Sequence, residues 1–155
     1  MWRTFMIAAA AALTLSAAAF AEQGGTAEEA KALLDKAVAA VKADKTKALD
    51  TFNEGKGGFL DRDLYVFCGD TTDGKIVANG NPNAKKLLGT DVRNLKDANG
   101  KAYGQAIFAA GQKSEGQITE ISGYLFPKPS DPKPASKNSF VTKVGDLFCG
   151  VGYYK

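Results

Sequence analysis

The sequence predicts an α+β domain, with helices clustered on one side of an antiparallel sheet. Three observations support this class. A long amphipathic segment comes first, at residues 26–53, and two short strand-like segments follow it around a tight turn. An irregular connector that contains one helix comes next. Three further strand-like segments then end the chain as a meander.

The first 21 residues have the pattern of a secretory signal peptide. Arg3 precedes an uncharged, alanine-rich run from Phe5 to Ala18, and Ala19-Phe20-Ala21 is a small-residue cleavage site. We therefore expect cleavage after Ala21 and a periplasmic or secreted protein that consists of one domain, residues 22–155. An uncleaved membrane anchor is the alternative, although the apolar run is short for a membrane span. No later stretch is long and apolar enough to cross a membrane.

The composition argues against several functional classes. The sequence contains no histidine, which removes the commonest general base, the Ser-His triads and most zinc and haem sites. It also has no phosphate-binding loop and no paired carboxylates on one element, so we expect no enzyme activity, no catalytic residues and no cofactor. The formal net charge of +3 is too small to indicate a nucleic-acid partner. The segments "DTTDG" and "DANG" lack EF-hand spacing, so we interpret both as turns and expect no metal site.

Residues 26–53 are predicted to form one long helix. Thr26 and Glu29 have the spacing of a capping box. The apolar residues that fall near one face of this helix are Leu34, Val38, Val41, Leu49 and Phe52. Lysines and acids fill the other face, and the glycines of residues 53–58 end the helix. The pattern is typical of an amphipathic lid on a sheet.

A hairpin and an irregular connector are predicted next. Residues 63–70 are rich in aromatic and β-branched side chains, and residues 75–79 are the return strand. Gly74 supplies the positive φ that closes the turn between them. Residues 80–101 are polar and interrupted by breakers, with short helical turns expected at 83–88. Residues 101–113 have apolar side chains at helical spacing and predict the helix of the connector.

The last three strands are predicted at residues 116–126, 136–144 and 147–155. Residues 127–134 contain four of the five prolines and are expected to be a loop, because proline cannot donate to a sheet ladder. Gly150 and Gly152 are two positions apart and lie on one face of the last strand. That face is left without side chains there, which favours the close approach of another group.

A series of short motifs follows one another along residues 27–155. Its members are Asp70, Gly74, Gly89, Asp91, Leu95, Asp97, Gly100, Tyr124-Leu125-Phe126-Pro127, Lys137, Ser139, Phe140 and Gly150-Val151-Gly152-Tyr153. In this order the chain resembles the single Cache family, the PAS-like extracytoplasmic sensor domains of bacterial receptors. The resemblance implies a PAS-like five-stranded antiparallel sheet, with the long N-terminal helix and the helical connector on one side. It also implies non-catalytic binding of a small molecule.

The sequence departs from the family pattern in ways that affect the expected ligand. The usual His-Pro step is spread over residues 79–82, Phe126 replaces the usual tryptophan, and Phe140 replaces the usual tyrosine. Each change removes a possible polar contact, so the class of ligand does not follow directly from the family. Receptor members continue into a transmembrane helix and a signalling domain, whereas this sequence ends at Lys155. We therefore expect a free-standing secreted form that serves a receptor or transporter partner.

The two cysteines, Cys68 and Cys149, are predicted to form a disulfide. An even count in a secreted protein favours pairing. The PAS-like sheet that the resemblance implies makes the first and last strands neighbours, which places the two cysteines side by side. Free buried thiols and a redox-active pair are the alternatives, although the sequence has no C-x-x-C motif and no activating histidine.

The resemblance also implies a ligand cavity between the sheet and the connector. The candidate ligand-binding residues are Tyr65, Phe67, Tyr103, Phe108, Tyr124, Phe126, Lys128, Lys137 and Phe140. Lys128 or Lys137 would face the carboxylate of a small organic acid, and Asp91 or Asp97 would face an amine. In the competing interpretation the aromatic side chains fill the core and the lysines lie on the surface. The domain is then a structural or interaction module, with a homodimer formed through the N-terminal helix.

Overall fold

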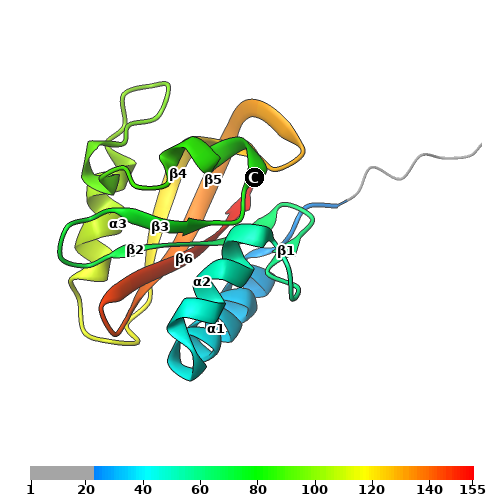
Figure 1. The fold of residues 1–155 in the computed structure, drawn as a ribbon. Coiled ribbons are helices and arrows are strands. Elements are labelled where there is room, and N and C mark those ends of the chain that lie inside the picture. The colour runs from blue at the N-terminus through cyan, green and yellow to red at the C-terminus, as the bar shows by residue number, and fades with distance from the viewer. Residues whose placement is uncertain (1–22) are drawn as a thin grey trace, which may run out of the picture.

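The domain is built on one antiparallel sheet. The computed structural model describes residues 23–155, so the predicted signal peptide and its cleavage site lie outside the described residues. The order of the strands is β1-β2-β6-β5-β4, and β3 pairs with β2 along the same edge as β1 (Figure 1). The strands are β1 (Leu60–Asp61), β2 (Leu64–Asp70), β3 (Ile76–Asn79), β4 (Thr119–Lys128), β5 (Asp131–Val144) and β6 (Leu147–Tyr154). The predicted five-stranded sheet is confirmed, with the two-residue β1 as an addition.

Two helices precede the sheet, where the sequence predicted one. They are α1 (Ala27–Ala43) and α2 (Lys45–Glu54), and the capping box of Thr26 and Glu29 is confirmed at the start of α1. The break falls at Asp44, whose backbone is extended, with φ −160° and ψ 100°. Its carboxylate accepts a hydrogen bond from the Lys47 N–H at 3.0 Å. A short acidic side chain satisfies a free N–H at a helix start, and here that preference overrides the continuous apolar pattern.

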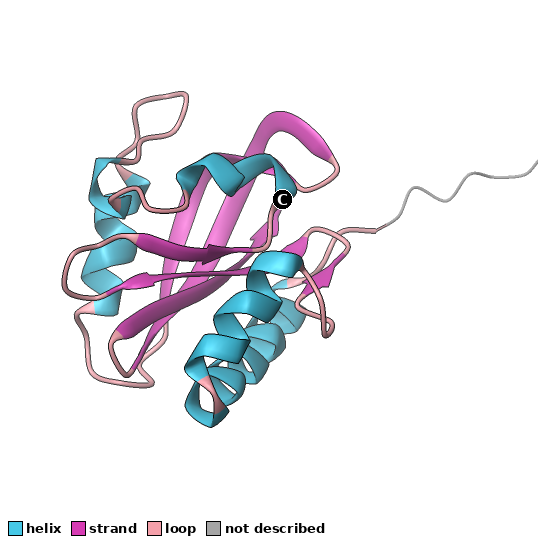
Figure 2. Cartoon of the chain, in the orientation of Figure 1, coloured by secondary structure: helices cyan, strands magenta, loops and turns pink. Residues whose placement is uncertain are grey.

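The helices lie on both faces of the sheet and not on one side (Figure 2). α1 and α2 pack on the face that presents Val66 and Cys68. The opposite face presents Phe67 and is covered by the connector, which contains η1 (Pro82–Leu87), η2 (Val92–Asn94) and α3 (Tyr103–Gly111). The two faces are separate because neighbouring residues of a strand point in opposite directions. The α+β class and the PAS-like sheet are confirmed, and the placement of the helices is corrected.

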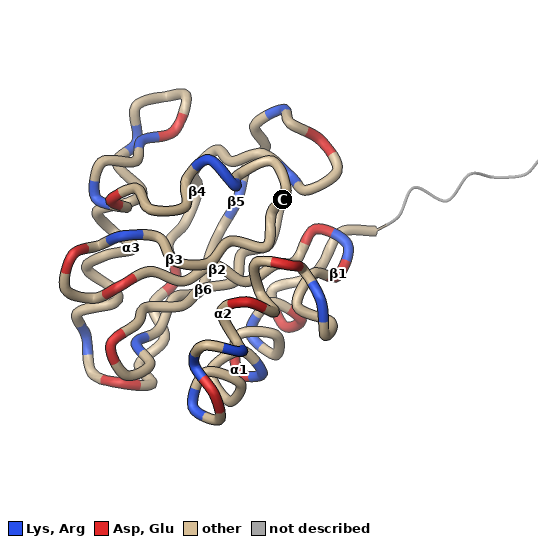
Figure 3. The backbone as a smooth tube through the Cα atoms, viewed as in Figure 1, with Lys and Arg blue, Asp and Glu red and all other residues tan. Residues whose placement is uncertain are grey.

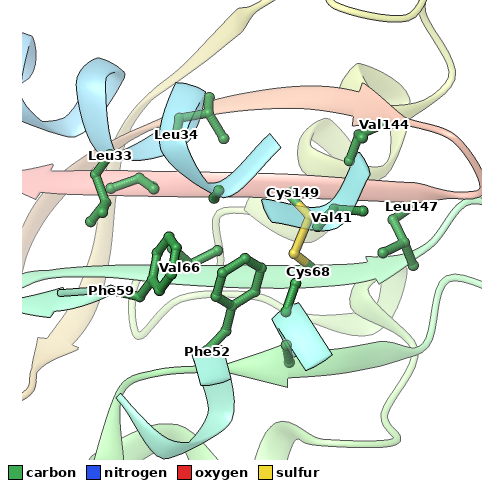
Figure 4. Packing of buried hydrophobic residues seen from close by; sticks show 14 of the residues in the cluster. Leu33, Leu34, Val41, Phe52, Phe59, Val66, Cys68, Val144, Leu147 and Cys149 are labelled. Atoms are coloured by element: carbon green, nitrogen blue, oxygen red, sulfur yellow. A yellow bond between two sulfur atoms is a disulfide. The ribbon is translucent and has the colours of Figure 1, made fainter. Parts of the chain in front are cut away.

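The predicted disulfide lies under the two helices. Cys68 and Cys149 are direct partners in the β2–β6 ladder, their Cα atoms are 4.1 Å apart, and they are bonded to each other. Both side chains are fully buried among apolar side chains of the helices and the sheet (Figure 4). The alternatives of free thiols and of an accessible redox pair are thereby excluded for this structure.

The proline-rich stretch forms a hairpin and not the loop that we expected. β4 and β5 continue past the sheet as a two-stranded arm in which Pro127 is paired with Pro134. β5 pairs with β6 only from Lys137 onward, so residues 131–135 of the arm have β4 as their one partner. Prolines are tolerated here because a two-stranded arm has free edges, where a missing N–H leaves no ladder bond unmade.

Charged side chains of both signs are interspersed over the helices, the connector and the hairpin ends (Figure 3). No helix within residues 23–155 is long and apolar enough to span a bilayer.

The disulfide joins positions 81 residues apart in the chain, so reducing it should lower the stability of the fold. Chain entropy predicts a loss of roughly 4 kcal/mol in the free energy of unfolding, because the reduced unfolded chain is less constrained. Urea unfolding with and without reductant measures the loss. The Cys68→Ala/Cys149→Ala variant is the control and should not respond to reductant. Equal midpoints for the oxidised and reduced protein would contradict the prediction.

Candidate functional site

A small cavity lies between the sheet and the connector. Its volume is about 30 Å³. Side chains from four strands and from the connector line it, and they are Tyr65, Phe67, Ile76, Asn79, Leu87, Val92, Leu95, Tyr103, Ile107, Tyr124, Phe126 and Lys137. The lining is mostly aromatic and aliphatic, and it contains one charged group. Few polar groups in an apolar enclosure are typical of small-molecule sites.

That charged group is the ammonium of Lys137, on β5. The residue is 1% exposed, and its Nζ donates a hydrogen bond to the Tyr65 hydroxyl at 2.7 Å. Lys137 forms no salt bridge with any carboxylate of residues 23–155. Aromatic rings surround the ammonium at 4.4–5.8 Å from their centroids, and they belong to Tyr65, Phe67, Tyr124, Phe126 and Tyr154. Ring faces attract a cation, but they do not neutralise it as a carboxylate does.

The glycines of β6 make room for the groups that fill this face. A Cβ atom at Gly152 would lie 2.1 Å from Cε of Lys137, and one at Gly150 would lie 2.4 Å from Cζ of Phe67. The close approach expected from the spacing of these glycines is confirmed. The group that approaches Gly152 is the aliphatic stem of Lys137, which crosses β6 to reach Tyr65 on β2.

The tyrosine hydroxyls around the ammonium form a directed chain. Tyr154 donates to the Pro127 carbonyl at 2.7 Å, so its oxygen is free to accept from the Tyr65 hydroxyl at 3.4 Å. Tyr65 in turn accepts from Lys137. This order fixes the hydroxyl hydrogens of Tyr65 and Tyr154, and it leaves two N–H groups of the ammonium without a hydrogen-bond partner among the described residues. An ammonium has three donors, and an oxygen anion is the group that suits the remaining two.

Burial controls the protonation of the site. It lowers the pKa of Lys137 to about 7, against a smaller opposing effect of the Asp63 carboxylate. It also raises the pKa of Tyr65 and Tyr124 well above the usual value and that of Tyr103 to about 12, so these hydroxyls stay neutral. The unfavourable term in both cases is the desolvation of a charge. An anion placed beside Lys137 would raise the pKa of the lysine again.

Six of the nine candidate ligand-binding residues lie on the cavity, and they are Tyr65, Phe67, Tyr103, Tyr124, Phe126 and Lys137. Phe108 instead packs edge-on against Phe148, with a centroid distance of 6.4 Å. The Lys128 ammonium lies 4.0 Å from the Asp63 carboxylate, outside the cavity lining. Phe140 lies on the opposite face, among the side chains under α1.

The acids considered for an amine ligand lie elsewhere. Asp91 is paired with Arg93 at 2.6 Å. Asp97 accepts hydrogen bonds from the backbone N–H groups of Asn99, Lys101 and Leu125. Neither residue lines the cavity.

Sequence reasoning missed six lining residues, Ile76, Asn79, Leu87, Val92, Leu95 and Ile107. Strand alternation could have found Ile76, and helical spacing places Ile107 beside Tyr103. The connector residues gave no such signal, because Leu87, Val92 and Leu95 lie in or beside short 3₁₀ turns without a regular period.

The sequence profile of the family described as single Cache domain 2 matches residues 8–154. The chain belongs to the single Cache family. Cache domains are extracytoplasmic sensory domains that bind small molecules and feed signalling partners. No curated protein sequence is similar enough to match this Cache domain.

Its fold is shared by solved structures, among them the following three. A methyl-accepting chemotaxis protein from Vibrio parahaemolyticus is 24% identical with a TM-score of 0.64, and the match covers 82% of this chain and 86% of that one. The periplasmic sensor domain of a chemotaxis protein is 24% identical with a TM-score of 0.58, over 82% and 88% of the two chains. A Cache chemosensory domain, whose structure addresses carboxylic acid recognition, is 20% identical with a TM-score of 0.59, over 82% and 86%.

The depressed pKa of Lys137 makes the stability of the ligand-free protein depend on pH. Between pH 7 and the ordinary lysine value the unfolded chain binds more protons than the folded one, so stability rises with pH in that window. Lys137→Met removes this term and should be more stable than the wild type at pH 7. Its advantage should shrink by roughly 2 kcal/mol by pH 9. Urea unfolding of both proteins at the two pH values measures it, and a constant difference would contradict the assignment.

Gly152→Ala should displace Lys137. The added methyl group overlaps the lysine stem and the Ser139 hydroxyl, 2.5 Å away, and such overpacking costs about 1–3 kcal/mol. Gly145→Ala is not a suitable control, because Gly145 has φ +60° and a side chain there would be strained. Val151→Ala is the control, because Val151 lies on the other face of β6 and its truncation should lower the free energy of unfolding by a similar amount. Only Gly152→Ala should also change the pH dependence described above. An unchanged pH profile would mean that Lys137 keeps its place.

Proposed function

We propose that this Cache domain binds a small carboxylate in the cavity beneath the connector and reports it to a signalling or transport partner. The observation that supports this function is the buried ammonium of Lys137, which faces the cavity and has no carboxylate partner among residues 23–155. A carboxylate would accept hydrogen bonds from the free N–H groups of the ammonium and would neutralise its charge.

A carboxylate suits the site better than an amine does. A cationic ligand would be repelled by Lys137, and Asp91 and Asp97 lie outside the cavity lining. The ring faces can enclose the apolar part of a small acid, as ligand pockets commonly do. The Cache neighbour studied for carboxylic acid recognition supports the same ligand class, although its fold alone is what the two proteins share.

The ligand must be small. A cavity of about 30 Å³ has room for roughly two water molecules. Even a two-carbon acid therefore requires the wall to move outward. The small volume also favours a competing function, a structural or interaction module whose cavity is filled by its own aromatic side chains. Ligand binding distinguishes the two functions.

We also propose that the protein works in the periplasm. Cache domains are extracytoplasmic, and the buried Cys68–Cys149 disulfide is of the kind that persists in oxidising compartments.

A thermal-shift screen tests the proposed ligand class. Acetate, propionate, lactate and pyruvate should raise the melting temperature in a concentration-dependent way, because a ligand that binds only the folded state stabilises it by mass action. The matching amines and alcohols, and sodium chloride at the same ionic strength, should not. Lys137→Met should abolish the shift, whereas Lys128→Met, which removes a lysine outside the cavity lining, should keep it. No shift with any carboxylate, or an equal shift in both variants, would contradict the proposal.

A further inference from the structure

A surface groove adjoins the buried cavity and shares part of its wall. The groove has a volume of about 360 Å³ and lies between the connector and the β4–β5 arm. Leu87, Leu95, Tyr103 and Phe126 line both the groove and the cavity. These four side chains therefore separate the ammonium of Lys137 from the outside on this side of the domain.

The four side chains differ in how firmly they are held. Tyr103 is 6% exposed and stacks on Tyr124 with a centroid distance of 4.4 Å. Leu87, Leu95 and Phe126 are only half-buried. The ring centroid of Phe126 lies 4.7 Å from Nζ of Lys137, so this ring is the part of the wall that lies against the ammonium. Tyr103 is the fixed part of the wall, and the other three have open space on their outer side.

The backbone on both sides of Phe126 is fastened to the connector. The Leu125 N–H donates to the Asp97 carboxylate at 2.9 Å, and the Asn81 side-chain amide donates to the Pro127 carbonyl at 2.8 Å. The Asn83 amide adds a bond to the Lys128 carbonyl at 2.8 Å. Because these bonds hold the chain on either side, rotation of side chains opens the wall at lower cost than movement of β4 away from the connector.

The groove favours an anion. Lys86 and Lys96 are exposed in its lining. Asp97 is the one acidic side chain in the lining among the described residues, and its oxygens accept the N–H groups of Asn99, Lys101 and Leu125. Two exposed cations at the entrance of a cleft raise the local concentration of a small anion and its rate of entry.

We propose that Leu87, Leu95 and Phe126 form a gate of side chains between the groove and Lys137, and that Phe126 sets the length of ligand that the cavity accepts. The proposal rests on the proposed function of the cavity as a carboxylate site. A short acid enters from the groove, its carboxylate reaches the ammonium, and the gate closes behind it. A longer acid holds the Phe126 ring away from its packed position and binds more weakly for that reason.

The test compares Phe126→Ala with Phe108→Ala by isothermal titration calorimetry against acetate, propionate, butyrate and hexanoate. Phe108 is a matched control, because it is also a half-buried phenylalanine but does not line the cavity or the groove. The wild type and Phe108→Ala should bind the shortest acids most tightly. Phe126→Ala should shift the preference toward butyrate and hexanoate by at least tenfold relative to acetate. If Phe126→Ala does not fold, Leu95→Ala shortens the same wall from the connector and should give a shift in the same direction.

The outcomes separate this proposal from the one on which it rests. Carboxylate binding with the same order of chain lengths in all variants would overturn the gate and leave the proposed function intact. A shift of equal size in Phe108→Ala would also overturn it. No binding of any carboxylate to the wild type or to Phe126→Ala would overturn the proposed function itself.

Discussion

The site is organised around one constraint, an ammonium group that is buried without a carboxylate. A charge taken out of water needs compensation from its surroundings. Here the surroundings are one hydroxyl and five ring faces, which is little for a group that is 1% exposed. Several features follow from this group, including the missing side chain at Gly152 and the ordered chain of hydroxyls from Tyr65 to Tyr154.

One face of the sheet carries the disulfide that stabilises the fold, and the other face carries the cavity. Cys68 and Phe67 are neighbours on β2, yet one joins the disulfide under the helices and the other lines the cavity. The disulfide fixes β2 against β6, and these two strands carry Tyr65 and Tyr154 on the other face. Asn79 connects the faces more directly. It lines the cavity, its N–H donates to the Asn53 side chain of α2 at 2.9 Å, and Lys85 donates to the carbonyls of both residues.

Local patterns in the sequence predicted the strands and the capping box, because alternation and caps are short-range properties. The even count of cysteines and the resemblance to the single Cache family predicted the disulfide. Asp44 shows where such reasoning failed: the apolar period of residues 26–53 runs through it, and only its cap geometry reveals the break. The prediction of a loop at the prolines of the arm was wrong for a related reason, since the effect of a proline depends on whether its strand has a free edge. Lys137 was recognised as a candidate, but its burial depends on Gly152, a residue of another strand. The connector side chains Leu87 and Leu95 could not be placed, because no regular period governs a 3₁₀ turn.

The combination of a small cavity and an unpaired charge determines what kind of selectivity the site can have. With about 30 Å³ of space, a ligand gains little from burying apolar area, and any area gained requires the Phe126 wall to move. The larger gain comes from the ammonium, whose desolvation is compensated only when an anion is beside it. Affinity should therefore follow the charge of the ligand, and discrimination among anions should follow the cost of displacing the wall. A long neutral molecule loses on both terms, whereas a compact carboxylate neutralises the ammonium and displaces the wall least.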